Sequence, residues 1–156
     1  MRNHGGAQPP LTVGPVVVIR REPCSACPYR RDVPSGLWVA EEYEKLLDYD
    51  KTTGEQPAAR FGCHATPEFD CHGWAVVHSN RGRACELLAL RLHHAMTGED
   101  DEIPEPFVPL FGSAAEAAAH GMKRIEDPDG DAVEAMERLL RKHPRLKTKD
   151  QAAQEL

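Results

Sequence analysis

Two stretches decide how this chain folds: Cys24-Ser-Ala-Cys27 and, 35 residues further on, Cys63-His-Ala-Thr-Pro-Glu-Phe-Asp-Cys71. The Cys-x2-Cys spacing lets two thiolates in a tight turn point at one ion. The seven residues between Cys63 and Cys71 form a loop that can fold back and present both sulfurs to the same point. Four thiolates satisfy either a tetrahedral zinc ion or the four irons of a [4Fe–4S] cluster. We therefore predict a metal centre on these four cysteines, with Zn2+ ranked ahead of the [4Fe–4S] cluster.

Two histidines directly follow the later cysteines, as His64 and His72. Each is an alternative ligand, or a hydrogen-bond donor to sulfur that tunes the centre. A residue next to a ligand usually points away from the metal, so the four-cysteine set ranks first. The fifth cysteine, Cys85, lies on the apolar face of a predicted helix, where a buried inert thiol is expected. Trp38 and Trp74 are predicted to be core anchors.

Composition places the chain among small proteins with a modest core. It has 156 residues, 40% of them hydrophobic and only 6% aromatic, and its net charge is -6. The length favours one domain, and net acidity argues against a protein that coats nucleic acid. The apolar run Val13 to Ile19 is too short to cross a bilayer and does not resemble a signal peptide. The sequence thus predicts a cytoplasmic protein without a membrane anchor. Thiols stay reduced in the cytoplasm, so paired cysteines there favour metal binding over disulfides.

Apolar periodicity and turn residues predict mainly helices. Two apolar runs, Val16 to Arg20 and Trp74 to His78, are predicted as short strands that pair with each other. The fold class is therefore mostly α (α+β), with four or so helices and two or three short strands around the four-cysteine metal centre. The predicted helices are Leu37–Asp48, Arg83–Met96, an alanine-rich helix capped by Ser113 and ending near Gly121, and a last helix after the cap Asp127-Pro128. We predict a disordered N-terminus over 1–14, one metal-stapled domain over 15–146 and a solvated tail over 147–156.

A basic cluster brackets the first cysteine stretch and is the candidate partner-binding surface. It consists of Arg20, Arg21, Arg30 and Arg31. Such a cluster can contact nucleic-acid phosphate or an acidic protein surface. Ion pairing with the many neighbouring acids is the more frequent role of such a cluster and is favoured here.

Several segments together resemble an uncharacterised family of short proteins found in actinobacteria and their phages. The segments are Cys24-Ser-Ala-Cys27-Pro-Tyr-Arg, Phe61-Gly-Cys-His64, Cys71-His-Gly-Trp74 and Leu88-Ala-Leu-Arg-Leu92, and the match covers about residues 22 to 140. The resemblance implies a defined fold around the four cysteines but carries no activity. His72 stands where a small residue is expected between Cys71 and Gly73, which matters if this histidine is a ligand.

Three functions compete at this point. The first is a non-enzymatic binding or regulatory module with a structural metal centre, and the second is an iron–sulfur redox or sensing protein. The third is a zinc-dependent hydrolytic enzyme with Glu68 or His64 as base, or a Cys63/His78 nucleophile pair. The chain lacks a Gly-x-Ser-x-Gly elbow, a phosphate-binding glycine loop and a His-Glu-x-x-His motif. An enzyme is therefore the least favoured of the three.

Overall fold

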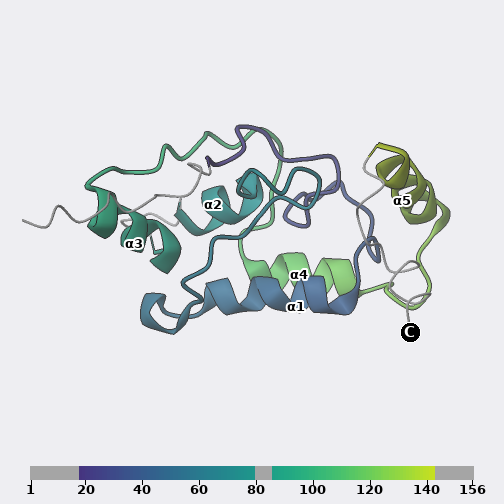
Figure 1. Cartoon of the computed structure of the whole chain (residues 1–156). Helices are drawn as coiled ribbons and strands as arrows, with labels where there is room; N and C mark the ends of the chain where they lie inside the picture. The colour runs from purple at the N-terminus through teal and green to yellow at the C-terminus, as the bar shows by residue number, and fades with distance from the viewer. Residues whose placement is uncertain (1–17, 80–85, 143–156) are drawn as a thin grey trace, which may run out of the picture.

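The structure is a computed structural model that describes residues 18–79 and 86–142. These residues form five α-helices and two short 3-10 helices, connected by long irregular segments. Helices α1 and α4 run side by side along one edge of the molecule, and α3 and α5 occupy its opposite ends (Figure 1). The α-helices are α1 (Ala40–Leu47), α2 (His72–Ser79), α3 (Leu88–Thr97), α4 (Ala114–Met122) and α5 (Gly130–Lys142), and the 3-10 helices are η1 (Asp48–Asp50) and η2 (Thr53–Glu55).

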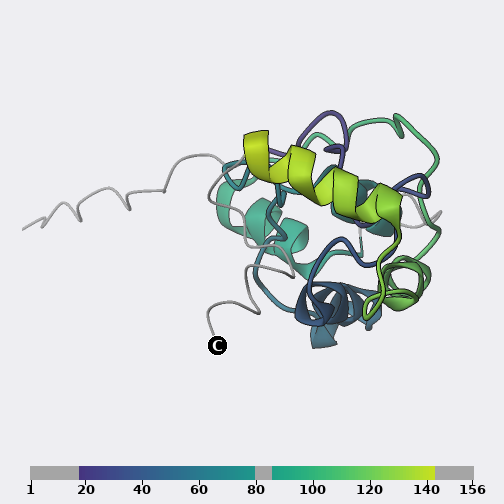
Figure 2. The same cartoon turned by 90° about the vertical axis from the view of Figure 1, so that its right-hand side faces the viewer.

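Helices α1 and α4 form the closest helix pair in the fold. The α1 helix buries Tyr43 and Leu46, as its apolar spacing predicts. The α4 helix begins at the predicted cap, where the Ser113 hydroxyl accepts a hydrogen bond from the Glu116 backbone N–H. The two helices approach closely because α4 presents small residues, among them Gly121, against the Tyr43 ring. The turned view also shows α1 and α4 as neighbours (Figure 2).

The Gly121→Ala variant tests this close approach. A Cβ at Gly121 would lie only 2.0 to 2.5 Å from atoms of the Tyr43 ring, so the helices must move apart. Overpacking of this kind costs about 1–3 kcal/mol. We expect a corresponding loss of unfolding free energy in urea denaturation. The matched Gly54→Ala variant has nothing within 4 Å of its new Cβ and should be close to neutral. An unchanged midpoint for Gly121→Ala would contradict this packing.

The predicted strands are wrong. No strand occurs within residues 18–79 and 86–142, which contain only three isolated bridges: Ile19 to Asp70, Gly62 to Asp70 and Arg30 to Leu110. The run Trp74 to His78 belongs to α2, all of whose residues from His72 to His78 are buried. A helix covered on every side shows no amphipathic period, so its short apolar run looks like a buried strand. Of the other predicted strand, residues 16 and 17 lie outside the described ranges.

Helices α3 and α5 begin later than predicted. Glu86 and Leu87 precede α3 without being helical, and Gly98 ends it in the left-handed conformation with φ 74°. At α5 the carboxylate of Asp129, rather than Asp127, accepts the hydrogen bond from the Ala132 backbone N–H. The predicted start at Asp127-Pro128 is therefore two residues early.

The core between the cysteine stretches and the helices is built on aromatic rings. Trp38 and Trp74 are fully buried, as predicted. The indole N–H of Trp38 donates to the carbonyl of Ala26, inside the first cysteine stretch. Tyr29, which follows this stretch, packs so closely on α2 that a Cβ at Gly73 would lie 2.5 Å from its Cβ. The first cysteine stretch is thereby held against both α2 and the segment before α1.

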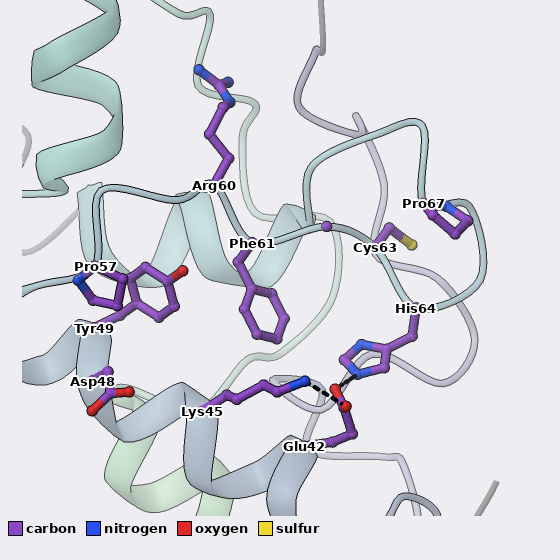
Figure 3. A pocket seen from close by; sticks show the side chains of 11 residues that line it. Glu42, Lys45, Asp48, Tyr49, Pro57, Arg60, Phe61, Cys63, His64 and Pro67 are labelled. Carbon is purple, nitrogen blue, oxygen red and sulfur yellow. Dashed lines mark hydrogen bonds and ion pairs between the residues drawn. The ribbon is translucent and has the colours of Figure 1, made fainter. Parts of the chain in front are cut away.

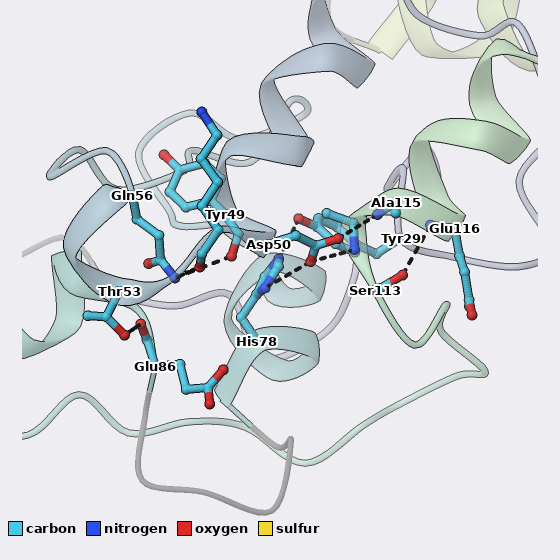
Figure 4. A network of polar contacts seen from close by, with 12 residues as sticks. Tyr29, Tyr49, Asp50, Thr53, Gln56, His78, Glu86, Ser113, Ala115 and Glu116 are labelled. Atoms are coloured by element: carbon cyan, nitrogen blue, oxygen red, sulfur yellow. Dashed lines mark hydrogen bonds and ion pairs between the residues drawn. The ribbon is translucent and has the colours of Figure 1, made fainter.

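A buried polar network ties the same region to α4 (Figure 4). The hydroxyl of Tyr29 lies 3.0 Å from Nε2 of His78, and the carboxylate of Asp50 lies 3.7 Å from its Nδ1. The same carboxylate accepts the backbone N–H groups of Ala114 and Ala115 at the start of α4. Asp50, at the end of η1, therefore caps the N-terminus of α4 with its side chain.

No helix in the described part of the chain has the length and apolar character needed to cross a membrane. The predicted N-terminal segment 1–14 and tail 147–156 lie outside the described residues, as does Cys85.

Candidate metal centre

The four predicted ligand cysteines are free and buried, and the fold brings them together in two contacts. Cys27 Sγ lies 3.8 Å from Cys71 Sγ. The side chains of Cys24 and Cys63 also interact, because each shifts the pKa of the other. Each contact joins one cysteine of the first stretch to one of the second. The tertiary structure therefore connects two segments that are 35 residues apart between Cys27 and Cys63.

In each contact the side-chain hydrogen bond shifts the pKa values of the two cysteines in opposite directions. The hydrogen bond from Cys24 lowers the pKa of Cys63 to about 4, while the same bond raises the pKa of Cys24. In the other contact, the hydrogen bond from Cys71 lowers the pKa of Cys27, and the pKa of Cys71 is raised. Charge on one contact also acts on the other, since Cys27 contributes to raising the pKa of Cys24. The two contacts are therefore close neighbours.

Backbone amides around the four sulfurs stabilise their charged forms. Hydrogen bonds from backbone groups lower the pKa of each cysteine, and most come from two or three residues further along the chain. Such amides offset the charge of thiolates gathered at one point. The backbone donors are Ala26 to Cys24, Tyr29 and Gly73 to Cys27, Ala65 and Thr66 to Cys63, and Trp74 to Cys71.

The described residues do not, however, form a ready metal site. Residues 18–79 and 86–142 contain no group of three or more His, Cys, Asp or Glu side chains arranged to hold an ion. The part of the fold prediction that placed a four-cysteine metal centre in the middle of the fold is therefore not reproduced. The sulfurs of Cys27 and Cys71 instead lie within hydrogen-bond distance of each other, at 3.8 Å.

The two alternative ligands each use one ring nitrogen within the protein. His72 Nδ1–H donates to the carbonyl of Arg20 at 3.0 Å, and His64 Nε2–H donates to Glu42 at 2.9 Å. The other nitrogens, His72 Nε2 and His64 Nδ1, are buried without a hydrogen-bond partner in the described part of the chain. A histidine with one nitrogen fixed and the other available is typical of a ligand. Ligation by His64 or His72 stays a prediction.

A cleft of about 480 Å³ adjoins the second cysteine stretch (Figure 3). Its apolar surface comes from Tyr49, Phe61 and two prolines, and Glu42 and Lys45 of α1 face it across from His64. The His64 and Lys45 hydrogen bonds lower the pKa of Glu42 to about 2. The lining residues are Glu42, Lys45, Asp48, Tyr49, Pro57, Arg60, Phe61, Gly62, Cys63, His64 and Pro67.

Two of the predicted basic residues serve the cysteine region itself. Arg20 donates to the Thr66 hydroxyl, which in turn hydrogen-bonds to the Cys63 sulfur. Arg30 forms a bidentate ion pair with Asp32, in which Nε and Nη2 lie 2.8 and 2.7 Å from the two carboxylate oxygens. The pKa of Arg30 is raised mainly by Asp32 and further by the two cysteines of the first stretch. Its charge therefore offsets negative charge at these sulfurs.

The other two arginines are also engaged. Arg31 donates to the carbonyl of Leu110 at 3.0 Å and lies over the Phe111 ring at 5.2 Å. Arg21 forms an exposed ion pair with Glu102 at 3.6 Å. All four arginines of the predicted cluster thus contact protein groups, and Arg21, Arg30 and Arg31 pair with carboxylates.

Sequence reasoning missed a buried charge cluster beside this site. The guanidinium of Arg60 binds the carboxylates of both Asp70 and Asp101, whose side chains are only 2% and 9% exposed. It joins the second cysteine stretch to the acidic segment after α3. Glu99-Asp-Asp-Glu102 reads as a solvated charge run, so no local signal marks Asp101 as buried.

The model of a family of unknown function, DUF6283, matches residues 19–142, a range that holds all four cysteines of the two contacts. The chain belongs to this family. Neither a curated protein nor a solved structure matches the chain. The family description states no activity, so membership of DUF6283 adds no catalytic residue to the site, and the link to actinobacteria and phages stays a prediction.

Proposed function

We propose that this protein is a non-enzymatic binding or regulatory module whose fold is held by one zinc ion on Cys24, Cys27, Cys63 and Cys71. The supporting observation is that all four cysteines are free and buried, that Cys27 Sγ lies 3.8 Å from Cys71 Sγ, and that Cys24 and Cys63 shift each other's pKa. Zinc binding would release the thiol protons, because a ligand cysteine binds as thiolate. The backbone hydrogen bonds to all four sulfurs support the same ligand set.

The sulfur separation favours a single ion over an iron–sulfur cluster. Four sulfurs about 2.3 Å from a tetrahedral zinc ion lie about 3.8 Å from one another. The Cys27 to Cys71 distance of 3.8 Å matches this value. In a [4Fe–4S] cluster each cysteine binds a different iron, so the sulfurs are held further apart. The cluster is therefore the second choice.

The enzyme alternatives gain no support from the described residues. Glu68, a candidate base, is exposed on the loop of the second cysteine stretch. His78, the other partner considered for Cys63, has its Nε2 hydrogen-bonded to Tyr29 in the buried network. Since the basic cluster is engaged with carboxylates and carbonyls, we favour a protein partner over nucleic-acid phosphate.

Metal analysis tests this proposal. Protein purified without oxygen and without added metal should contain one equivalent of zinc, and X-ray absorption should show sulfur ligands at about 2.3 Å. Cobalt substitution should give the intense absorption bands of a tetrahedral thiolate site. The Cys85→Ser variant is the matched control and should keep full metal content. Iron with inorganic sulfide would replace zinc by the cluster, and absence of any metal would refute the proposal.

A further inference from the structure

A groove of about 900 Å³ lies between residues 18–22 and residues 99–107. Both segments run along the upper side of the molecule in Figure 1. None of the four cysteines lines this groove, but it exposes three large apolar side chains, Val18, Phe69 and Phe107, with 49%, 36% and 61% of their surfaces accessible. Single exposed apolar residues are common, whereas several around one groove mark a surface that binds a partner.

Negative charge surrounds this apolar surface. The groove is lined by six carboxylates and only two arginines, both of which already contact protein groups. Three of the carboxylates pair with basic side chains of the protein. The other three, Glu22, Glu99 and Glu105, make no ion pair within residues 18–79 and 86–142. A ligand of this groove therefore needs positive charge beside its apolar groups.

The backbone at one wall of the groove has an open edge. Ile19 forms a parallel bridge with Asp70, and the two hydrogen bonds of this bridge use the Val18 carbonyl and the Arg20 N–H, each at 3.0 Å. The N–H and C=O of Ile19 itself make no hydrogen bond with any described residue, and Ile19 lines the groove. Such unpaired groups at the edge of a bridge pair readily with an added extended chain.

The opposite wall does not close this edge. It runs through Ile103-Pro-Glu-Pro106, and proline has no N–H with which to pair. No bridge joins residues 18–22 to residues 99–107 in the described part of the chain. The edge at Ile19 is therefore available to a further extended segment that enters the groove.

We propose that this groove binds an extended peptide segment of a partner protein, in which apolar residues alternate with lysine or arginine. Side chains of an extended chain point alternately to opposite sides, so one set packs on Phe69 and Phe107 while the other reaches the unpaired carboxylates. The peptide backbone pairs with Ile19. This inference rests on the binding role proposed above, for which it names the partner class, and no metal ion takes part in it.

A titration of the full-length protein tests the groove. Fluorescence anisotropy follows the binding of a short labelled peptide that alternates valine with lysine. We expect saturable binding that weakens as salt is added, because the carboxylates attract the lysines. A peptide with glutamate in place of lysine should not bind. In the complex, hydrogen exchange of the Ile19 amide, measured by NMR, should slow at least about tenfold, because its N–H becomes hydrogen-bonded.

Two pairs of variants locate the contact. Phe107→Ser removes an apolar side chain of the groove, and we expect about tenfold weaker binding. Met96→Ser is its matched control, because Met96 is 84% exposed on α3 and lies outside the groove lining. Glu105→Gln should weaken binding about threefold, whereas Glu137→Gln on α5 should leave it unchanged. All four side chains are exposed, so none of the substitutions is expected to affect folding.

The outcomes separate this inference from the proposed metal centre. Failure of the peptide to bind, or equal affinity of Phe107→Ser and the parent protein, would overturn the inference whatever the metal content. Protection of the Ile19 amide in the free monomer would show that this chain fills its own groove, and protection that grows with protein concentration would show that a second copy fills it. Either result would also overturn the inference. A protein that binds the peptide but holds no zinc would refute only the metal centre.

Discussion

Replacing Cys27 or Cys71 by serine is expected to abolish cooperative unfolding. Their sulfurs lie 3.8 Å apart, and an ion held there closes the 35-residue loop between the cysteine stretches. Zinc in small structural sites contributes about 10–16 kcal/mol of binding that appears as folding free energy. Even a fraction of this matches the ~5–15 kcal/mol net stability of a typical domain. Thermal melts of Cys27→Ser and Cys71→Ser, followed by circular dichroism, should therefore show a broad, non-cooperative transition. The same result is expected for Cys24→Ser and Cys63→Ser.

Treatment with a chelator shows whether a bound ion, rather than packing of the thiols, stabilises the fold. A strong chelator should remove the cooperative transition of the unmodified protein in the same way as the substitutions. The Cys85→Ser variant should keep the parent melting temperature and its sensitivity to chelator. If the cysteine variants unfold while the chelator has no effect, the sulfurs stabilise the core without metal. Any one of the four variants that melts at the parent temperature would show that its cysteine is not a structural ligand.

Replacing Arg60 by methionine is expected to cost about 3 kcal/mol at pH 7, because two buried carboxylates lose their cation. Asp70 and Asp101 both bind this guanidinium, and Asp70 also forms the backbone bridges that join Ile19 and Gly62. Urea denaturation measures the loss. Arg124→Met is the matched control: Arg124 is 46% exposed, pairs with exposed acids, and should change stability by less than about 0.5 kcal/mol.

The pH dependence of the stability loss in Arg60→Met shows whether charge or packing causes it. Burial raises the pKa of Asp70, and Arg60 counteracts part of this rise. Without Arg60 the pKa of Asp70 rises further, so the folded variant takes up protons that the unfolded chain does not. Lowering the pH from 7 toward 4 neutralises the Asp70 carboxylate in the variant and should shrink the stability difference between Arg60→Met and the parent. A difference that does not change with pH would show that packing, rather than charge, causes the loss.

The sequence by itself determined the amphipathic helices, whereas metal binding by the four cysteines stays a prediction. Tyr43 and Leu46 recur at helical spacing, and Ser113 with Glu116 marks a helix start within a few residues. These signals are local, because a helix forms its hydrogen bonds within four residues and exposes one face. The four cysteines were predicted as one group because a Cys-x2-Cys turn and a seven-residue loop can each present two sulfurs to one point.

Only the tertiary structure decided the rest, because it depends on contacts between distant residues. The run Trp74 to His78 lies in the buried helix α2. Because it is covered on all sides, it lacks the apolar period by which a helix is told from a strand. The approach of Cys27 to Cys71 depends on how α2, which begins at His72, packs on Tyr29. Burial of Asp101 depends likewise on Arg60, 41 residues earlier in the chain, which no local pattern of charges reveals.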